Sequence, residues 1–237
     1  TWSEAASLAP GAAVLVSGRV EELAAPKGLP LTRLKASAVV PAEGAATLPP
    51  AVRLADRLPL PSVVDDDGLA RFEPATDAID LWESLEGMRL EVPAGTAVGP
   101  SSSRGDFVLR PDDAPQVLRT AAGGVLLPES GPSLDRVLFG RTFGGEMSPV
   151  DVGARIAGPT VGIVDYSWGS YRVRPLTPPV VETPGRGCDV VTSLAGDRRR
   201  LTAATLNVEN LSVAGPAERF AAIGALVARR MRGPDVI

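Results

Sequence analysis

Glycine and proline interrupt this chain so often that long helices and long unbroken strands have little room. The 237 residues include 25 Gly and 23 Pro, and the apolar residues between them are mostly Val, Leu and Ala in short runs. Glycine weakens the interior of an element and proline removes a backbone donor, so this pattern favours short strands joined by turns. We therefore expect a mainly β fold, made of several small units, until near the C-terminal end.

Charge and residue usage exclude several kinds of site. The 24 Lys+Arg and 28 Asp+Glu leave a net charge of -4, so any binding of nucleic acid has to be local. The absence of histidine excludes His-based metal sites and Ser-His-Asp triads within these residues. The single cysteine, Cys188, has no partner for an internal disulfide. No apolar run is long enough to span a membrane, so we expect no membrane contact.

The first expected unit is a β-hairpin within residues 1–60. Val14, Val16 and Val20 fall on one face of a strand, and residues 31–36 form the return strand after a Pro- and Gly-rich loop. The start of the chain carries neither an initiator Met nor a signal pattern, so we expect that Thr1 is not the natural N-terminus.

Residues 61–79 are expected to connect this unit to the next. The surrounding stretch is rich in Pro and Ala, and proline cannot donate to a regular ladder. Asp65, Asp66 and Asp67 could form a Ca²⁺ loop only if ligands alternated with spacers and a distal Glu followed in register. They do not, so we interpret the triplet as a solvated turn.

A second β unit is predicted at residues 80–176. Turn residues separate its apolar runs at the spacing of a small Greek-key barrel or sandwich. Its strands are expected at Arg89–Val92, Phe107–Arg110, Gly124–Leu127, Arg136–Phe139, Thr160–Asp165 and Ser170–Arg174. A weak similarity between residues 10–20 and 152–164 suggests two related β units in tandem, and the alternative is two unrelated hairpins that look alike. A linker rich in Pro and Gly follows at 177–200.

In residues 201–237 the spacing of the apolar residues changes, and the new pattern predicts a β-α-β arrangement. Residues 201–208 resemble a strand buried on both faces, and an amphipathic helix opens at Pro216 and stops at Gly233. Asp235–Ile237 then begins another strand.

Polar residues appear where the first of these strands gives way to a loop. Asn207 and Glu209 supply the hard oxygen ligands that Mg²⁺ prefers, at the carboxyl end of a strand, where α/β enzymes place their sites. The alternative is an Asn/Glu turn that only caps the strand.

The run Ala204-Thr205-Leu206-Asn207-Val208-Glu209-Asn210-Leu211, followed by the helix and by Pro234-Asp235-Val236-Ile237, resembles the start of the endonuclease/exonuclease/phosphatase family. Upstream, residues 85–88, 98–101 and 162–173 resemble the OB-like region that precedes the catalytic domain in secreted bacterial nucleases of this family. Leu206 stands where an aromatic residue is common in the family. The resemblance implies tandem OB-like barrel units, a partial one at 1–60 and a second at 80–176. It also implies that 201–237 begins a four-layered α/β phosphodiesterase domain, with the chain truncated at both ends.

The resemblance also implies site roles. Asn207 would be catalytic, orienting the metal or the scissile phosphate, and Glu209 would lie near the metal as a second ligand. The metal would be Mg²⁺, or Mn²⁺ or Ca²⁺ in its place, and the remaining catalytic residues would lie beyond Ile237. The parent protein would then be an extracellular or cell-surface nuclease hydrolysing DNA or RNA, and these residues alone would be inactive.

Five residues near the end of the second β unit combine aromatic rings with cations. OB barrels bind single strands by stacking bases on aromatic side chains beside cations. The alternative is that these rings pack a hairpin or dock the β unit onto the next domain. The five residues are Tyr166, Trp168, Tyr171, Arg172 and Arg174.

Two other functions remain open from the sequence. One is a non-catalytic β module that binds nucleic acid or polysaccharide, and the other is a phosphatase of the same fold.

Overall fold

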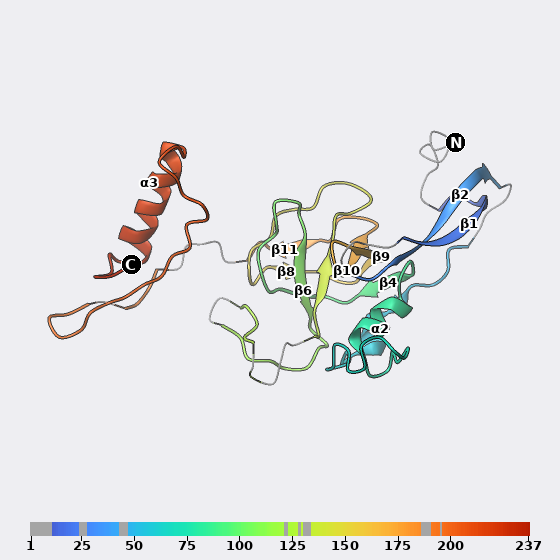
Figure 1. Cartoon of the computed structure of the whole chain (residues 1–237), viewed down its shortest axis with the longest axis horizontal. Helices are drawn as coiled ribbons and strands as arrows, with labels where there is room; N and C mark the ends of the chain where they lie inside the picture. The colour runs from blue at the N-terminus through green and yellow to red at the C-terminus, as the bar shows by residue number, and fades with distance from the viewer. Residues whose placement is uncertain are drawn as a thin grey trace. The chain divides into compact units, whose positions relative to one another are not determined.

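The computed structural model describes residues 11–23, 28–42, 47–120, 123–127, 129, 134–185, 191–194 and 196–237. Contacts within the chain separate two compact units, Thr1–Gly185 and Arg186–Ile237. We call them the sheet unit and the C-terminal unit and describe each by itself (Figure 1). Part of the predicted linker, residues 186–190 and 195, lies outside the described residues.

The predicted β-hairpin is present at the start of the sheet unit. Strands β1 (Val14–Leu23) and β2 (Leu31–Pro41) pair antiparallel, with an irregularity after Ser17. Gly18 is required there, because a Cβ atom would lie 2.5 Å from the backbone oxygen of Lys35. A two-stranded ribbon cannot bury either face by itself, so most of its residues are exposed.

Nine short strands form a single mixed sheet in the rest of the unit. They lie in the order β11-β8-β5-β6-β7-β10-β9-β4-β3, and the pairs β7–β10 and β3–β4 are parallel. The strands are β3 (Val52–Arg53), β4 (Arg89–Val92), β5 (Gly95–Ala97), β6 (Phe107–Pro111), β7 (Val137–Phe139), β8 (Arg155–Ile156), β9 (Thr160–Ser167), β10 (Ser170–Pro175) and β11 (Val181–Thr183).

The prediction of a mainly β chain is confirmed, and the sheet is open in the described residues, with no pairing between its first and last strands. Five of the six strands predicted in the second β unit match β4, β6, β7, β9 and β10 closely. The sixth prediction, a strand at Gly124–Leu127, is wrong: its described residues form only an isolated bridge between Val125 and Arg119.

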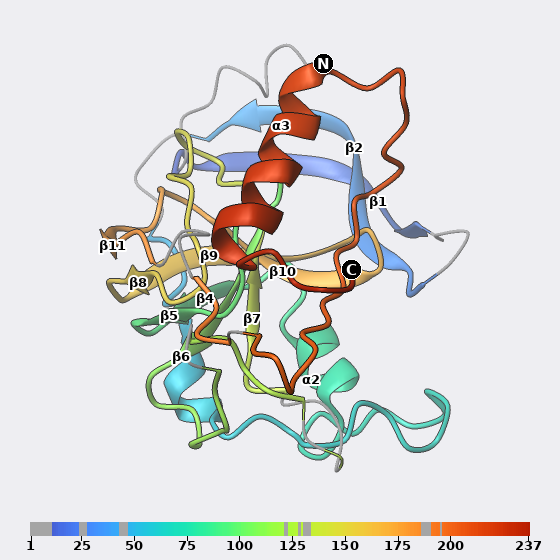
Figure 2. The same cartoon turned by 90° about the vertical axis from the view of Figure 1, so that its left-hand side faces the viewer.

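One hydrophobic core serves the whole sheet. Phe107 and Phe139 stack at its centre, with ring centroids 5.2 Å apart and planes 13° apart. Helix α2 (Ala78–Ser84) lies below β7 and β10 in Figure 2, and Leu81 is buried in the same core. The short 3₁₀ turn η1 (Leu54–Arg57) contributes Leu54. Residues from strands at opposite parts of the order, such as Leu90 in β4 and Ile156 in β8, share this core. The sheet therefore curls around it.

The C-terminal unit contains the predicted helix. Helix α3 (Ala217–Ala225) continues into the π-helical turn η2 (Leu226–Arg230), and Gly233 ends the helical segment with a φ of 56°. The strands predicted on either side reduce to one parallel bridge between Ala203 and Val236. None of the described residues of this unit is buried, so the strand expected to be covered on both faces is not covered here.

Candidate functional site

Asn207 lies where the extended segment that pairs with Val236 turns away toward the helix. Its side-chain oxygen Oδ1 accepts a hydrogen bond of 2.9 Å from the backbone N–H of Glu209. The amide group therefore fixes the turn that Asn207 begins, as Asn side chains commonly do at strand ends. Asn207 is exposed, and so is Glu209.

The backbone after Asn207 adopts an unfavourable conformation. Glu209 and Asn210 have φ angles of 40° and 52°. Non-glycine residues seldom adopt this left-handed region, and such residues concentrate at binding and catalytic sites. The two predicted ligands, Asn207 and Glu209, therefore lie on a loop with two successive residues in this region.

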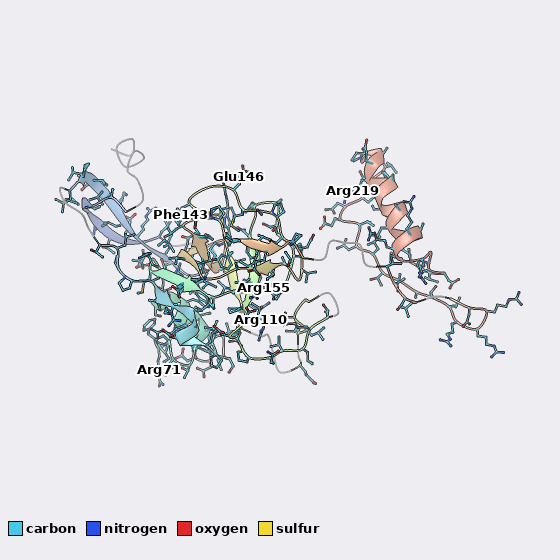
Figure 3. The ribbon with its side chains drawn as sticks, turned by 180° about the vertical axis from the view of Figure 1, so that it is seen from behind. Arg71, Arg110, Phe143, Glu146, Arg155 and Arg219 are labelled. Atoms are coloured by element: carbon cyan, nitrogen blue, oxygen red, sulfur yellow. The ribbon has the colours of Figure 1, made fainter. Side chains whose placement is uncertain are left out.

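Arg219 holds the loop from the first turn of α3. Its guanidinium nitrogen Nη2 donates a hydrogen bond of 2.7 Å to the carbonyl oxygen of Val208 and a second one to that of Glu209. Figure 3 shows Arg219 at the start of the helix. A pocket of about 270 Å³ opens between the loop and the helix, lined by Asn207, Glu209 and Arg219 among others. Polar side chains from two elements therefore meet at one solvent-accessible place.

A second polar contact holds the two extended segments together. Asp235 accepts hydrogen bonds from the backbone N–H of Thr202, at 2.8 Å, and from its hydroxyl, at 2.9 Å. These two bonds lower the pKa of the Asp235 carboxyl. Asp235 therefore stabilises the parallel pairing that carries Asn207 at its end.

The described residues do not by themselves make a metal site. No three His, Cys, Asp or Glu side chains within the described ranges come together in a way that could hold a metal ion. Of the two predicted ligands on the loop, Asn207 and Glu209, Asn207 already uses Oδ1 in the turn. Divalent Mg²⁺ requires more ligands than these two side chains supply.

The structure separates the five aromatic and cationic residues predicted as a weak nucleic-acid site. Tyr166 is buried, and its hydroxyl accepts a hydrogen bond of 2.8 Å from the backbone N–H of Leu29 in the hairpin. Tyr171 packs against the core, and its hydroxyl donates to Glu83. Burial, together with this contact, raises the pKa of the Tyr171 phenol. Tyr166 therefore attaches the hairpin to the sheet, and Tyr171 serves packing.

The two arginines of β10 also differ. Arg172 is buried, pairs with Asp106 at 3.3 Å and donates to the backbone oxygen of Ser167 at 2.7 Å. Arg174 lies over the ring of Phe143, 4.0 Å from its centroid, and donates to the backbone oxygen of Arg141. Only Arg174 remains accessible to a ligand.

Trp168 is the most exposed of the five. Its side chain is 81% exposed at the tip of the β9–β10 hairpin, and the guanidinium carbon of Arg104 lies 4.8 Å from the ring centroid. The accessible members of the predicted set are therefore Trp168 and Arg174. Each is paired with a residue from another loop, Arg104 or Phe143.

The comparisons with known proteins describe one part of the chain. A family model described as "Domain of unknown function (DUF8508)" matches residues 40–184, more than half of the 237 residues. The chain belongs to this family. The matched region covers the nine-stranded sheet and includes Arg104, Phe143 and Trp168, whereas Asn207 and Glu209 lie after it. No curated protein and no solved structure matches the chain significantly.

Sequence reasoning missed four residues that shape these places. Arg219 and Asp235 act through contacts with residues ten or more positions away, which no local pattern encodes. Arg104 and Phe143 lie on irregular loops without periodicity, although an exposed aromatic residue in a polar loop is a usable signal.

Proposed function

We propose that the protein is a metal-dependent phosphodiesterase of the endonuclease/exonuclease/phosphatase type, a nuclease that hydrolyses DNA or RNA. The observation that carries the proposal is the loop of Asn207, Glu209 and Asn210, which follows a segment bridged in parallel to Val236 on the far side of the helix in sequence. The sequence of this segment resembles the first strand, helix and second strand of that family. By the same resemblance we propose an extracellular or cell-surface location.

The arrangement of the C-terminal unit supports the proposed phosphodiesterase function. The carboxyl end of a strand followed by a crossover helix is where α/β enzymes hold their ligands. The parallel bridge between Ala203 and Val236 brings the two strand segments side by side, as such a crossover requires. Asn207 and Glu209 are exposed at that end, and Arg219 holds their turn.

The curled sheet is compatible with an OB-like unit before the catalytic domain. Its strands share one core even though they lie far apart in the strand order. We propose the OB-like description for this sheet and the four-layered α/β description for the domain that the C-terminal unit would begin.

The proposed metal is Mg²⁺, with Mn²⁺ or Ca²⁺ as substitutes. Bound there, such an ion would supply Lewis-acid chemistry. Asn207 and Glu209 would contribute to its binding in a complete domain, and the two side chains do not form a site by themselves. None of the helices in the part of the chain that the structure describes has the length and apolar character needed to cross a bilayer.

The experiment compares two forms of the protein. Cleavage of labelled DNA and RNA is measured with the 237-residue chain and with a longer form, extended at the C-terminal end so that the proposed domain is complete. We expect chelator-sensitive, Mg²⁺-dependent cleavage by the longer form alone. Chelator-sensitive cleavage by the purified 237-residue chain would contradict the proposal that this chain lacks part of the catalytic site. An inactive longer form would contradict the proposed phosphodiesterase activity.

A further inference from the structure

Two arginine–aromatic pairs lie on one surface of the nine-stranded sheet. Arg104 lies 4.8 Å from the ring centroid of Trp168, and Arg174 lies 4.0 Å from that of Phe143. Trp168 is 81% exposed and Phe143 is 53% exposed, so both rings keep accessible area beside their cation. We call these four residues, together with Arg141, the arginine–aromatic surface.

Strand β10 connects the two pairs. Arg172 and Arg174 alternate with Val173, which is buried in the core, so both arginines project from the opposite face of the strand. Gly140 lets them lie close to the loop after β7, because a Cβ atom there would come within 2.8 Å of Cδ of Arg172. At one end of β10 is the Trp168 turn and at the other is Arg174 over Phe143, and the strand spans roughly 13 Å from Ser170, which follows the turn, to Arg174.

The turn that carries Trp168 exposes the ring to solvent, although its backbone conformation is unfavourable for a tryptophan. Ser167 pairs with Ser170, so Trp168 and Gly169 form a two-residue hairpin loop, with φ angles of 56° and 76°. Asn, Asp or Gly is preferred at the first position of such a loop, because both central residues need a positive φ. A tryptophan that is mostly exposed gains little from packing there.

A groove of about 720 Å³ borders the same surface. The β5–β6 loop and the β7–β8 loop line it, and Figure 3 shows Phe143 and Glu146 on the second of these loops. Its polar lining consists of Ser101, Ser102, Ser103, Arg104, Arg141, Thr142, Glu146 and Asp151.

Positive charge on this surface is local to the two rings. In the described part of the chain, no ion pair engages Arg104, Arg141 or Arg174, while Arg172 is neutralised by Asp106. The carboxylates nearby that make no ion pair are Glu146 and Asp151, which line the groove, and Asp165, which lies opposite Arg172 in β9. The surface as a whole is therefore balanced in charge, and an anionic ligand would be attracted only at the arginines beside Trp168 and Phe143.

We propose that the arginine–aromatic surface binds single-stranded nucleic acid, with bases stacked on Trp168 and Phe143 and phosphates beside the three unpaired arginines. Exposed rings beside cations, without a fixed pattern of donors, suit bases of any sequence. The choice of nucleic acid as the ligand rests on the proposed function. A neutral polysaccharide would use the rings without the arginines.

Binding is measured by fluorescence anisotropy on the 237-residue chain. The probe is a labelled oligothymidine or oligouridine of about 12 nucleotides, within the range of about 4–16 nucleotides that OB folds cover. With three arginines engaged, the logarithm of the association constant should fall against the logarithm of salt concentration with a slope of about −2. Affinity should then drop about tenfold between roughly 50 and 150 mM salt. No divalent ion is added, so loss of hydrolytic activity and loss of binding are separate outcomes.

Substitutions test the two kinds of contact. Trp168→Asn and Phe143→Ala should each weaken binding about tenfold by removing a stacking ring. Arg104→Ala and Arg174→Ala should each reduce the salt slope by about 0.7. The matched controls are Phe72→Ala and Arg71→Ala, an exposed ring and an exposed arginine on a loop well away from Phe143 in Figure 3, and both should leave binding unchanged.

Trp168→Asn also separates a binding role from a structural one. Asparagine suits the hairpin turn better than tryptophan, so the variant should melt at an equal or higher temperature while it binds less tightly. A lower melting temperature with a parallel loss of binding would assign Trp168 to the fold and overturn the proposal. Undetectable binding at low salt, or salt-independent binding that a neutral polysaccharide displaces, would also overturn it.

Discussion

Different interactions stabilise the sheet unit and the C-terminal unit, each within itself. In the sheet unit, residues such as Leu90, Phe139 and Val173 are fully buried in one core. In the C-terminal unit no described residue is buried, and Leu201 is 83% exposed and Val213 fully exposed. There, order comes from polar contacts such as those of Arg219 and from the helix itself.

The stable core and the proposed catalytic loop therefore lie in different units of the chain. A packed core makes the sheet unit the stable part of the chain, whereas a helix without a covered apolar face is marginal in water. Loops drawn from the less stable part of a protein commonly carry binding or catalytic groups. The strained Asn207 loop lies in such a part, and the arginine–aromatic surface is supported by a rigid sheet.

The largest expected effect comes from opening a cavity in the core. Phe139→Ala removes a fully buried ring that stacks on Phe107, so the free energy of unfolding should fall by about 3–5 kcal/mol. Phe220→Ala in α3, where the ring is 40% exposed, should cost less than about 1 kcal/mol. Denaturant unfolding followed by circular dichroism measures both. Equal losses would mean that α3 belongs to a packed core.

A smaller effect is expected when a buried ion pair of the sheet loses its cation. Arg172→Ala leaves Asp106 unpaired, and since Asp106 is partly exposed we expect a loss of about 2–3 kcal/mol of unfolding free energy. Arg174→Ala removes a cation–π contact with Phe143 and an exposed hydrogen bond to the backbone oxygen of Arg141, together worth about 1 kcal/mol at an accessible site. If the two variants unfold alike, the division between a structural and an accessible arginine is incorrect.

The smallest effect is a pH dependence confined to the C-terminal unit. Because hydrogen bonds from Thr202 lower the folded-state pKa of Asp235, its contribution is present above the unfolded pKa of about 3.9 and is lost as pH falls through the folded value. The protection factors of the Ala204 and Val236 amides, whose N–H groups donate across the bridge, should therefore fall at acid pH before those in β9 do, after correction for the intrinsic pH dependence of exchange. Asp235→Asn should remove this difference, and a simultaneous change in both regions would contradict it.

Local patterns predicted the strands better than their arrangement. Short alternating runs located β4, β6, β9 and β10, because a half-buried strand repeats every two residues. The parallel pairing of β7 with β10 joins distant segments, and its register depends on the core, which no local pattern encodes. Residues 124–127 resemble a strand but find only one bridging partner. Helix α2 is too short for a period to identify it.

As with the strands, the sequence predicted individual residues of the candidate site but not the contacts between them. Asn207 and Glu209 could be selected because polar residues after an apolar run mark the end of a strand. Arg219 and Asp235 could not, since their roles depend on which backbone groups come within hydrogen-bonding distance. Alternation placed Arg172 and Arg174 on one face, but only the folded chain brings Asp106 to one of them and Phe143 to the other.

The most direct test of the proposed function is the turnover of Asn207 variants in the longer form of the protein. Asn207→Asp keeps an oxygen that can accept the hydrogen bond from the Glu209 N–H, so the turn and the melting temperature should be retained. Phosphodiester cleavage should nevertheless fall by about 100-fold or more, because the amide is replaced by a charged group at the reacting phosphate. Asn210→Gly, which suits the φ of 52° at that position, should keep its activity. Undiminished cleavage by Asn207→Asp and Asn207→Ala would show that Asn207 only caps a strand and would contradict the proposed role.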